Sequence, residues 1–148
     1  MAAQRVRIAL DSRYVIALLC DWHAHHHRTL RSYQHWHDRD AQIVLPVHTI
    51  LECYSVLTRM PPPYRLPPDI ATQTIVENFA GSAVVVGVKS GGIWERIESL
   101  ARLGIGGGQV YDALIAWCAA EAGATLLLTW NLKHFGATAP RDLKVREP

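Results

Sequence analysis

The chain has 148 residues, of which 49% are hydrophobic and 19% charged, and its formal net charge is +2 at pH 7. This composition is typical of a globular protein and excludes a disordered chain, and the length fits one domain over residues 1–148. The net charge is too small to indicate nucleic-acid binding by itself, so a nucleic-acid substrate would have to be attracted by a local site.

Three cysteines lie far apart among apolar residues, at Cys20, Cys53 and Cys118. Their number is odd and no pair has the spacing of zinc ligands, which predicts buried free thiols in a reducing compartment. The N-terminus leads directly into a short strand pattern, so no signal peptide is expected. No apolar run reaches the roughly 18 residues of a membrane helix. We therefore expect a soluble, cytoplasmic protein that does not enter membranes.

Short β-branched runs alternate with helical patterns along the whole chain. In chain order the patterns predict a strand at 6–10, a helix at 14–19, a helix at 22–39, a strand at 43–46, a helix at 47–59, a helix at 70–79, a strand at 83–88, a helix at 91–103, a helix at 109–122, a strand at 125–128 and a strand at 143–146. This alternation indicates a mainly parallel central sheet covered by helices on both faces, a three-layer α/β/α sandwich.

Two of the predicted helices show apolar residues at helical spacing. The helix at 47–59 is predicted to bury one stripe: Val47, Ile50, Leu51, Tyr54 and Leu57. The helix at 91–103 is predicted to bury a second stripe: Ile93, Ile97 and Leu100. Glu52 lies on a separate polar stripe of the first helix, and taken alone that stripe is typical of a solvated face.

The segment at 22–39 is rich in histidine. His23 and His27 stand four residues apart, a spacing that can hold a metal ion on a helix. No acid or cysteine nearby completes a set of ligands, which favours a solvated helix.

Three acids lie on three separate elements of the predicted fold. Asp11 ends the first strand, Glu52 lies within a helix, and Asp112 falls in the first turn of another helix. The functional crevice of an open parallel sheet lies beyond the carboxyl ends of its strands, where Asp11 falls. An acid in a first helical turn is also stabilised by the helix dipole, by about 0.3–1 kcal/mol, so Asp112 has a purely structural alternative.

Carboxylates that meet in space repel one another and raise one another's pKa. Mg²⁺ or Mn²⁺ removes this cost, because these ions prefer hard oxygen ligands. Such ions also generate hydroxide from water and neutralise the charge on a leaving oxygen. The three acids therefore favour a divalent-metal site that cuts a phosphodiester, provided that they lie together in the fold.

Four segments carry a resemblance to a known family. They are Ala9-Leu-Asp11-Ser12, Glu52 within its helix, Val110-Tyr-Asp112-Ala-Leu-Ile-Ala116, and Leu128-Thr129-Trp-Asn131-Leu-Lys-His-Phe135. Together they resemble the PIN domain, and most of all the small VapC-type toxins. The resemblance implies a ribonuclease that uses Mg²⁺ or Mn²⁺, an RNA substrate, a cognate antitoxin that covers the site, and a homodimer.

The resemblance also assigns roles to single residues. Asp11, Glu52 and Asp112 become the metal-binding acids, and the hydroxyls of Ser12 and Thr129 steady a water or a carboxylate. Many PIN domains have a fourth acid where this chain has Asn131, which can offer an amide oxygen but brings no charge. Asn131 is therefore kept as a site residue, and the number of ions stays open.

Basic side chains beside these positions form a further set of candidates. Phosphate contacts are possible at Arg13, Arg59, Lys133 and His134, with solvated charge as the alternative for each. Gly104, Gly106, Gly107 and Gly108 precede the helix of Asp112 without the strand or the Lys-Ser/Thr of a nucleotide-binding loop. These glycines are predicted to shape the entry to that helix.

Three functions are compatible with this sequence, and the first is the metal-dependent endoribonuclease of a type II toxin–antitoxin pair. The second is a catalytically weak or inactive PIN-like module that binds RNA or regulates. The third is a phospho-acceptor or nucleotide-binding α/β domain, which requires an adjacent acid pair or a glycine fingerprint near the first strand. The segment Asp11-Ser12-Arg13 supplies neither feature, so this function ranks last.

Overall fold

The computed structural model describes residues 4–136 and 138–148. Its centre is a five-stranded sheet in the order β3-β2-β1-β4-β5, with every neighbouring pair parallel. The strands are β1 (Arg7–Leu10), β2 (Gln42–Pro46), β3 (Val84–Val86), β4 (Leu126–Leu128) and β5 (Lys144–Arg146). The helices are α1 (Ser12–Leu19), α2 (His26–His37), α3 (Val47–Arg59), α4 (Pro68–Phe79), α5 (Ile93–Arg102), α6 (Gln109–Glu121) and the 3₁₀ turn η1 (Leu132–His134).

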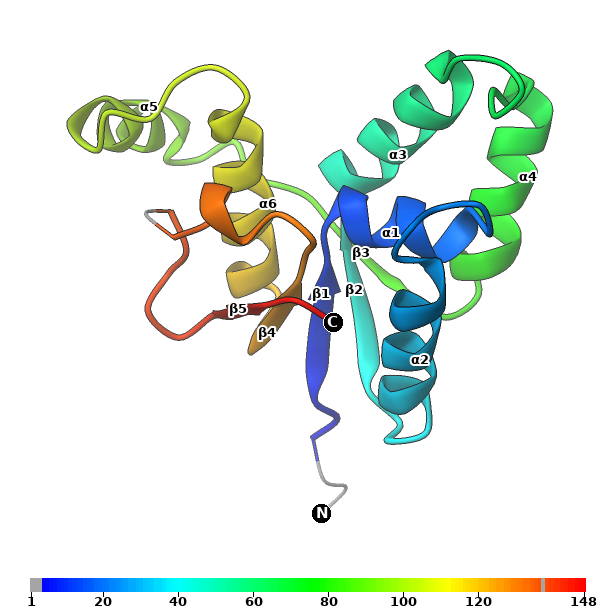
Figure 1. Ribbon diagram of the computed structural model, residues 1–148. Coiled ribbons are helices and arrows are strands. Elements are labelled where there is room, and N and C mark those ends of the chain that lie inside the picture. The colour runs from blue at the N-terminus through cyan, green and yellow to red at the C-terminus, as the bar shows by residue number, and fades with distance from the viewer. Residues whose placement is uncertain (1–3, 137) are drawn as a thin grey trace.

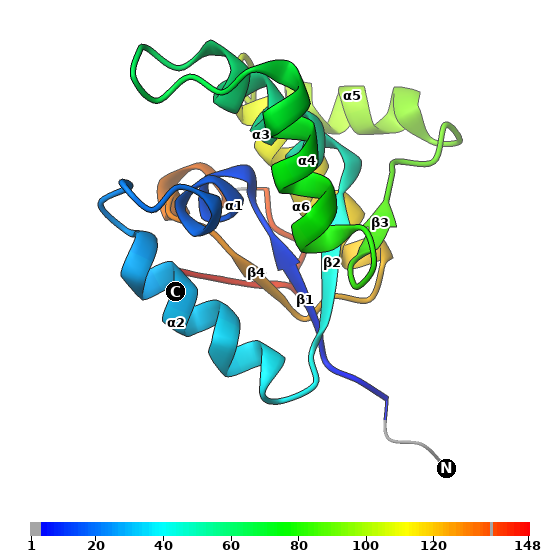
Figure 2. The ribbon, with the colours of Figure 1, turned by 90° about the vertical axis from the view of Figure 1, so that its right-hand side faces the viewer.

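Helices cover both faces of the sheet. Figure 1 shows α6 on one side of the strands and α1 and α2 on the other, and Figure 2 shows α2 and α4 in front of the strands with α6 behind. This arrangement confirms the predicted three-layer α/β/α sandwich with a parallel central sheet.

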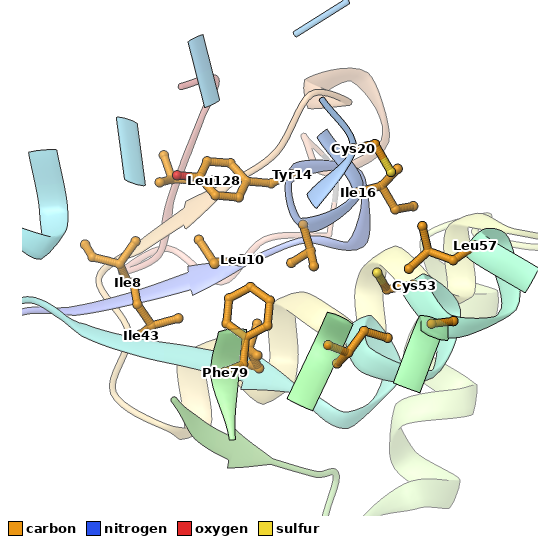
Figure 3. Close-up of a cluster of buried hydrophobic side chains, with 14 of the residues drawn as sticks. Ile8, Leu10, Tyr14, Ile16, Cys20, Ile43, Cys53, Leu57, Phe79 and Leu128 are labelled. Carbon is orange, nitrogen blue, oxygen red and sulfur yellow. The ribbon is translucent and has the colours of Figure 1, made fainter. Parts of the chain in front are cut away.

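Successive residues of β1 point to opposite faces and join two separate cores. Ile8 and Leu10 pack with side chains of α1, α3 and α4, including Tyr14 and Phe79 (Figure 3). Ala9 packs on the other face, in a cluster with Ile115 and further side chains of α6. The central strand is therefore buried on both faces, which explains why its sequence is continuously apolar.

The predicted buried face of α3 is wrong in part. Leu57 is buried, but Leu51, Val47 and Tyr54 are 61%, 41% and 37% exposed, and Cys53 and Thr49 occupy the inward positions instead. Cys53 belongs to the core cluster that also contains side chains of α1 and α4. The prediction for α5 is also wrong in part. Leu100 is buried as predicted, whereas Ile97 is 51% exposed, because the described residues pack against only part of that apolar stripe.

The sheet order creates a topological switch point at its centre. From β1 the chain builds outward through β2 and β3, and it then returns to the other side of β1 to form β4 and β5. Leu10 pairs with Leu128 in register, and the backbone N–H of Asp11 donates to the Leu128 carbonyl at 3.1 Å. The residues that follow β1 and β4 therefore lie side by side at the carboxyl edge, where open α/β sheets bind their ligands.

The cysteines agree with the prediction from their spacing. Cys20, Cys53 and Cys118 are free and buried. Burial raises the pKa of the Cys53 thiol to about 12, which keeps it in the unreactive protonated form. Among the described residues, no helix combines the length and the apolar character that crossing a bilayer requires.

The two leucines of α3 give a matched test of which face is buried. We expect Leu57→Ala to lower the free energy of unfolding by about 2–5 kcal/mol, because Leu57 is 1% exposed and its loss leaves a cavity. We expect Leu51→Ala to change it by less than about 0.5 kcal/mol. Urea unfolding of both variants measures the difference, and equal losses would contradict the observed orientation of α3.

Candidate active site at the carboxyl edge of the sheet

Asp11 lies at the centre of the carboxyl edge, between the end of β1 and the start of α1. It is the N-cap residue of α1, yet its side chain makes no capping hydrogen bond. Its carboxylate is 0% exposed and accepts a hydrogen bond from the Thr129 hydroxyl, with 2.7 Å between Oγ1 and Oδ2. Helix capping therefore does not account for this acid, which points to the residues after β4.

Burial raises the pKa of the Asp11 carboxyl above its ordinary value, and the negative charge of Asp112 adds to this effect. The Thr129 hydrogen bond and the Arg13 charge act in the opposite direction and offset only part of it. The site thus holds a carboxylate whose charge is costly without a cation beside it.

Glu52 reaches Asp11 through a shared neighbour. The Ser12 hydroxyl donates to Glu52 Oε2 at 2.7 Å. The oxygen of this hydroxyl, Ser12 Oγ, also lies 3.3 Å from Asp11 Oδ1. One helical turn before Glu52, His48 places its Nε2 3.8 Å from Glu52 Oε2 and stacks on the exposed Tyr111 ring. Glu52 is therefore held toward Asp11 and is the more open of the two acids.

Asp112 enters the site from the opposite face of the sheet. The helix α6 leads into β4, which is parallel to β1, so its first turn begins at the carboxyl edge. Gly104 and Gly107 in the preceding loop have φ values of +68° and +58°, a region that favours glycine. Asp112 is only 4% exposed, so it lies inside the molecule as well as in the first turn of the helix.

Arg13 stands between two of the acids. Its Nη1 lies 3.4 Å from Asp112 Oδ1 and 3.6 Å from Asp11 Oδ2, so both carboxylates face one guanidinium nitrogen. On its other side Asp112 places Oδ2 3.1 Å from His134 Nδ1. These contacts gather the acids of β1 and α6 around a single positive charge.

Thr129 and Asn131 complete the edge. The Asn131 backbone N–H donates to Thr129 Oγ1 at 2.9 Å, which fixes the hydroxyl that bonds to Asp11. The side-chain nitrogen of Asn131 is buried and has no hydrogen-bond partner among the described residues. A buried amide without a partner is costly, and such groups mark sites where a ligand or water belongs.

The three predicted acids thus belong to one connected network, but they meet in pairs. Asp11 and Asp112 meet across Arg13, and Asp11 and Glu52 meet across Ser12. Within residues 4–136 and 138–148, no group of three or more His, Cys, Asp or Glu side chains is close enough to form a metal site as it stands. The donor oxygens are nevertheless of the type that Mg²⁺ and Mn²⁺ prefer.

The basic candidates divide into two groups. Arg13 and His134 contact Asp112, whereas Arg59 at the end of α3 and Lys133 in η1 are exposed. Phosphate contacts by these side chains remain a prediction. His48 was not singled out as a site residue, although its position four residues before Glu52 on the polar stripe was a usable signal.

Fold and site together define a class: a parallel α/β sandwich with acids gathered at the switch point of its sheet. The chain belongs to the PIN domain family, whose model matches residues 8–137. Among curated proteins it is similar to two from Mycobacterium tuberculosis, both over 120 residues. It shares 32% identity with Ribonuclease VapC40, covering 81% of this chain and 84% of the relative, and 38% with Ribonuclease VapC27, covering 80% and 81%.

Solved structures show the same fold at low sequence identity. VapC20 of Mycobacterium tuberculosis, described as a Sarcin-Ricin loop cleaving toxin, has a TM-score of 0.66 at 18% identity and covers 90% of this chain and 99% of its own. VapBC2 from Rickettsia felis, bound to a DNA fragment of its promoter, has a TM-score of 0.66 at 15% identity and covers 97% and 99%.

The raised pKa of Asp11 predicts how stability changes with pH. Between the ordinary carboxyl pKa and the raised one, the folded protein binds more protons than the unfolded chain, so stability falls as pH rises through this window. Asp11→Asn removes this loss. In metal-free buffer we expect the variant to be more stable than the wild type at neutral pH, with a difference that shrinks as pH falls below the window.

Urea unfolding in EDTA over a pH series measures this difference. Asp69→Asn is a matched control, because Asp69 is an exposed acid in the first turn of α4. An Asp11→Asn variant that is less stable than the wild type by the same margin at every pH would contradict the account.

Proposed function

We propose that this chain acts as a single PIN-like domain with divalent-metal-dependent endoribonuclease activity, and that it is the toxin of a type II toxin–antitoxin pair. The names of its curated relatives support ribonuclease activity. The observation that carries the proposal for the site is the meeting of two buried acids, Asp11 and Asp112, at one cation-binding position occupied by the Arg13 guanidinium.

Asp11, Glu52 and Asp112 are the residues that would hold Mg²⁺ or Mn²⁺. Two features of the site fit such an ion: its acids offer hard oxygen ligands, and two of them already share a positive charge. When bound, the ion supplies an activated water and neutralises the charge that develops on the phosphodiester.

The protein's own residues fix the geometry of these acids. Thr129 binds Oδ2 of Asp11, and its hydroxyl is fixed in turn by the Asn131 backbone. Ser12 fixes one oxygen of Glu52. Holding the carboxylates in place before the substrate arrives lowers the cost of organising the site during the reaction.

Arg13 has a second role in this proposal. Were Asp11 and Asp112 to hold a divalent ion, they would no longer need the Arg13 guanidinium as their counter-charge, and Arg13 would be free to turn outward. Its side chain is 39% exposed and can reach solvent. Arginine binds phosphate oxygens in a two-pronged geometry, so the freed Arg13 is suited to hold the RNA backbone at the cutting site.

The partners are proposals as well. The similar fold of a VapBC complex supports a cognate antitoxin that covers the site, and a homodimer is proposed by analogy with VapC-type toxins. The exposed apolar side chains of α3, including Leu51, offer surface for such contacts. A cytoplasmic location accords with the free buried cysteines.

Two features of the site favour a second candidate function. Asn131 stands where many PIN domains have an acid, and Arg13 already balances two of the acids. Both features weaken the attraction for divalent ions, so a PIN-like module that binds RNA with little or no cleavage is the alternative.

Cleavage of defined RNAs by the purified protein separates the two functions. We expect cutting with Mg²⁺ or Mn²⁺ and none in EDTA, and we expect Asp11→Asn and Asp112→Asn each to lower the rate by about a hundredfold or more, because each removes a metal ligand. Asp69→Asn, the exposed first-turn acid of α4, should cut at the wild-type rate.

Two results would decide against the nuclease. Cleavage that persists in EDTA would exclude dependence on metal. An Asp112→Asn variant as active as Asp69→Asn would show that Asp112 serves only the helix.

Asn131 gives a test of the ion site without RNA. Asn131→Asp adds a negative charge at the edge where Thr129 bonds to Asp11, so we expect Mn²⁺ to bind about tenfold tighter, measured by calorimetry. We expect the same variant to be less stable than the wild type in EDTA, because it adds a buried charge. Unchanged Mn²⁺ affinity would show that Asn131 lies outside the ion site.

A further inference from the structure

A cavity of about 510 Å³ opens directly beside the acids. Arg13 lines it and also contacts Asp11 and Asp112, so the cavity continues from the acid site. Val56, one helical turn beyond Glu52 on α3, lines it as well, as does Trp130, which lies between Thr129 and Asn131 in the chain. Its size falls within the range of cavities that bind small molecules, roughly 300–1,000 Å³.

The lining of this cavity is apolar and aromatic, with one arginine. Its rings are those of Trp22, His23, His25 and Trp130, and its permanent charge is Arg13. The other lining residues are aliphatic (Ile16, Ala24, Val56 and Met60), and no acidic side chain is among them. Such a lining differs from the acid site beside it, and it suits a planar ring attached to a phosphate.

Trp130 is held rigidly in this lining. Its ring stacks on His25 with 3.9 Å between centroids and 10° between planes, and its N–H donates to the Thr29 hydroxyl at 2.9 Å. The Arg28 guanidinium lies 5.1 Å from the ring centroid. A fixed aromatic wall with cations around it requires little ordering when a ligand binds.

Trp22 is an exposed aromatic side chain of the cavity. Its side chain is 42% exposed, and its ring packs against Tyr64 with 4.3 Å between centroids. An exposed indole supported by another ring from below is a ready stacking surface. This exposure is not explained by packing in the core.

We propose that this cavity is a subsite for one unpaired nucleobase of an RNA strand, which stacks on Trp22 while the adjoining phosphate lies at Arg13. The inference rests on the proposed nuclease function and adds to it a position for one base next to the cutting site. A base inside a duplex is stacked on its neighbours and unavailable, so such a subsite rejects continuous double-stranded RNA.

An apolar peptide side chain is the other occupant that such a cavity could take. The nucleobase is favoured because the cavity is continuous with the acid site, has Arg13 at the junction, and has the Arg28 guanidinium over the Trp130 ring of its wall. These features match a base joined to a phosphate and add nothing to the binding of a neutral apolar side chain.

The test measures binding of a fluorescein-labelled single-stranded RNA of mixed sequence to the full chain in EDTA. It uses an Asp11→Asn background, which removes one repelling charge and one of the two carboxylates that hold Arg13 in the absence of metal. We expect Trp22→Ala to weaken binding about tenfold and Trp22→Phe to restore most of it, because stacking needs a ring. Trp94→Ala, which removes a 74% exposed tryptophan of α5, is the matched control and should bind like its parent. The same RNA annealed to its complement should bind weakly, with no effect of Trp22.

Adenosine monophosphate and ribose 5-phosphate provide the second arm, as competitors for the labelled strand. We expect the nucleotide to displace the strand and the sugar phosphate, which has no base, to leave it bound. Three results would each overturn the subsite. They are a Trp22→Ala variant that binds the strand as tightly as its parent, a Trp94→Ala variant that loses as much affinity as Trp22→Ala, and duplex RNA that binds as tightly as the single strand. If Trp22→Ala loses only the binding of a leucine-rich peptide, the cavity is a peptide site and the proposal falls.

Neither arm requires metal or cleavage, so failure of the subsite and failure of the nuclease are distinguishable. If the protein cuts RNA in a metal-dependent way and its Trp22→Ala variant binds RNA normally, only the proposed subsite is wrong. If RNA binding depends on Trp22 and the protein never cuts RNA, the subsite stands and the proposed nuclease activity is wrong.

Discussion

The burial of the Asp11 carboxylate at the end of the central strand is the constraint on which the site depends. A carboxylate with no exposed surface is costly unless hydrogen bonds and a positive charge surround it. Thr129 and Arg13 provide these partners, yet burial still raises the pKa of Asp11. The ionised form of Asp11 is thus only partly compensated, and that residual cost is what a cation can relieve.

The topology explains why residues so distant along the chain meet around this carboxylate. The strand β1 lies between β2 and β4, so the segments that follow β1 and β4 emerge side by side. The helix α6 leads into β4 and therefore brings Asp112 to the same edge, while α3 follows β2 directly and brings Glu52. The acids on these elements reach the edge of the sheet from both faces, which leaves the space above β1 as their common position.

The sequence was sufficient to predict the layered parallel fold and the position of Asp11 at the carboxyl edge, while the meeting of the three acids was a condition that it could only state. It could not predict which stripe of α3 is buried, because periodicity identifies an apolar stripe but not what covers it; Leu51 is exposed while Cys53 is in the core. Nor could it place Arg13 between Asp11 and Asp112, because that contact joins residues 99 positions apart. The aromatic cavity was missed for the same reason, since its lining comes from α1, the loop after it, α3 and the residue after Thr129.

The central claim is that Asp11 and Asp112 share one cation position, that Ser12 holds Glu52 beside it, and that Arg13 occupies this position when no metal is bound. Anomalous diffraction from crystals soaked in Mn²⁺ tests it most directly. The account predicts a manganese peak in contact with carboxylate oxygens of Asp11 and Asp112, with the Arg13 guanidinium displaced from between them. The claim would be contradicted if, at saturating Mn²⁺, the manganese peak lay elsewhere and Arg13 remained paired with both acids.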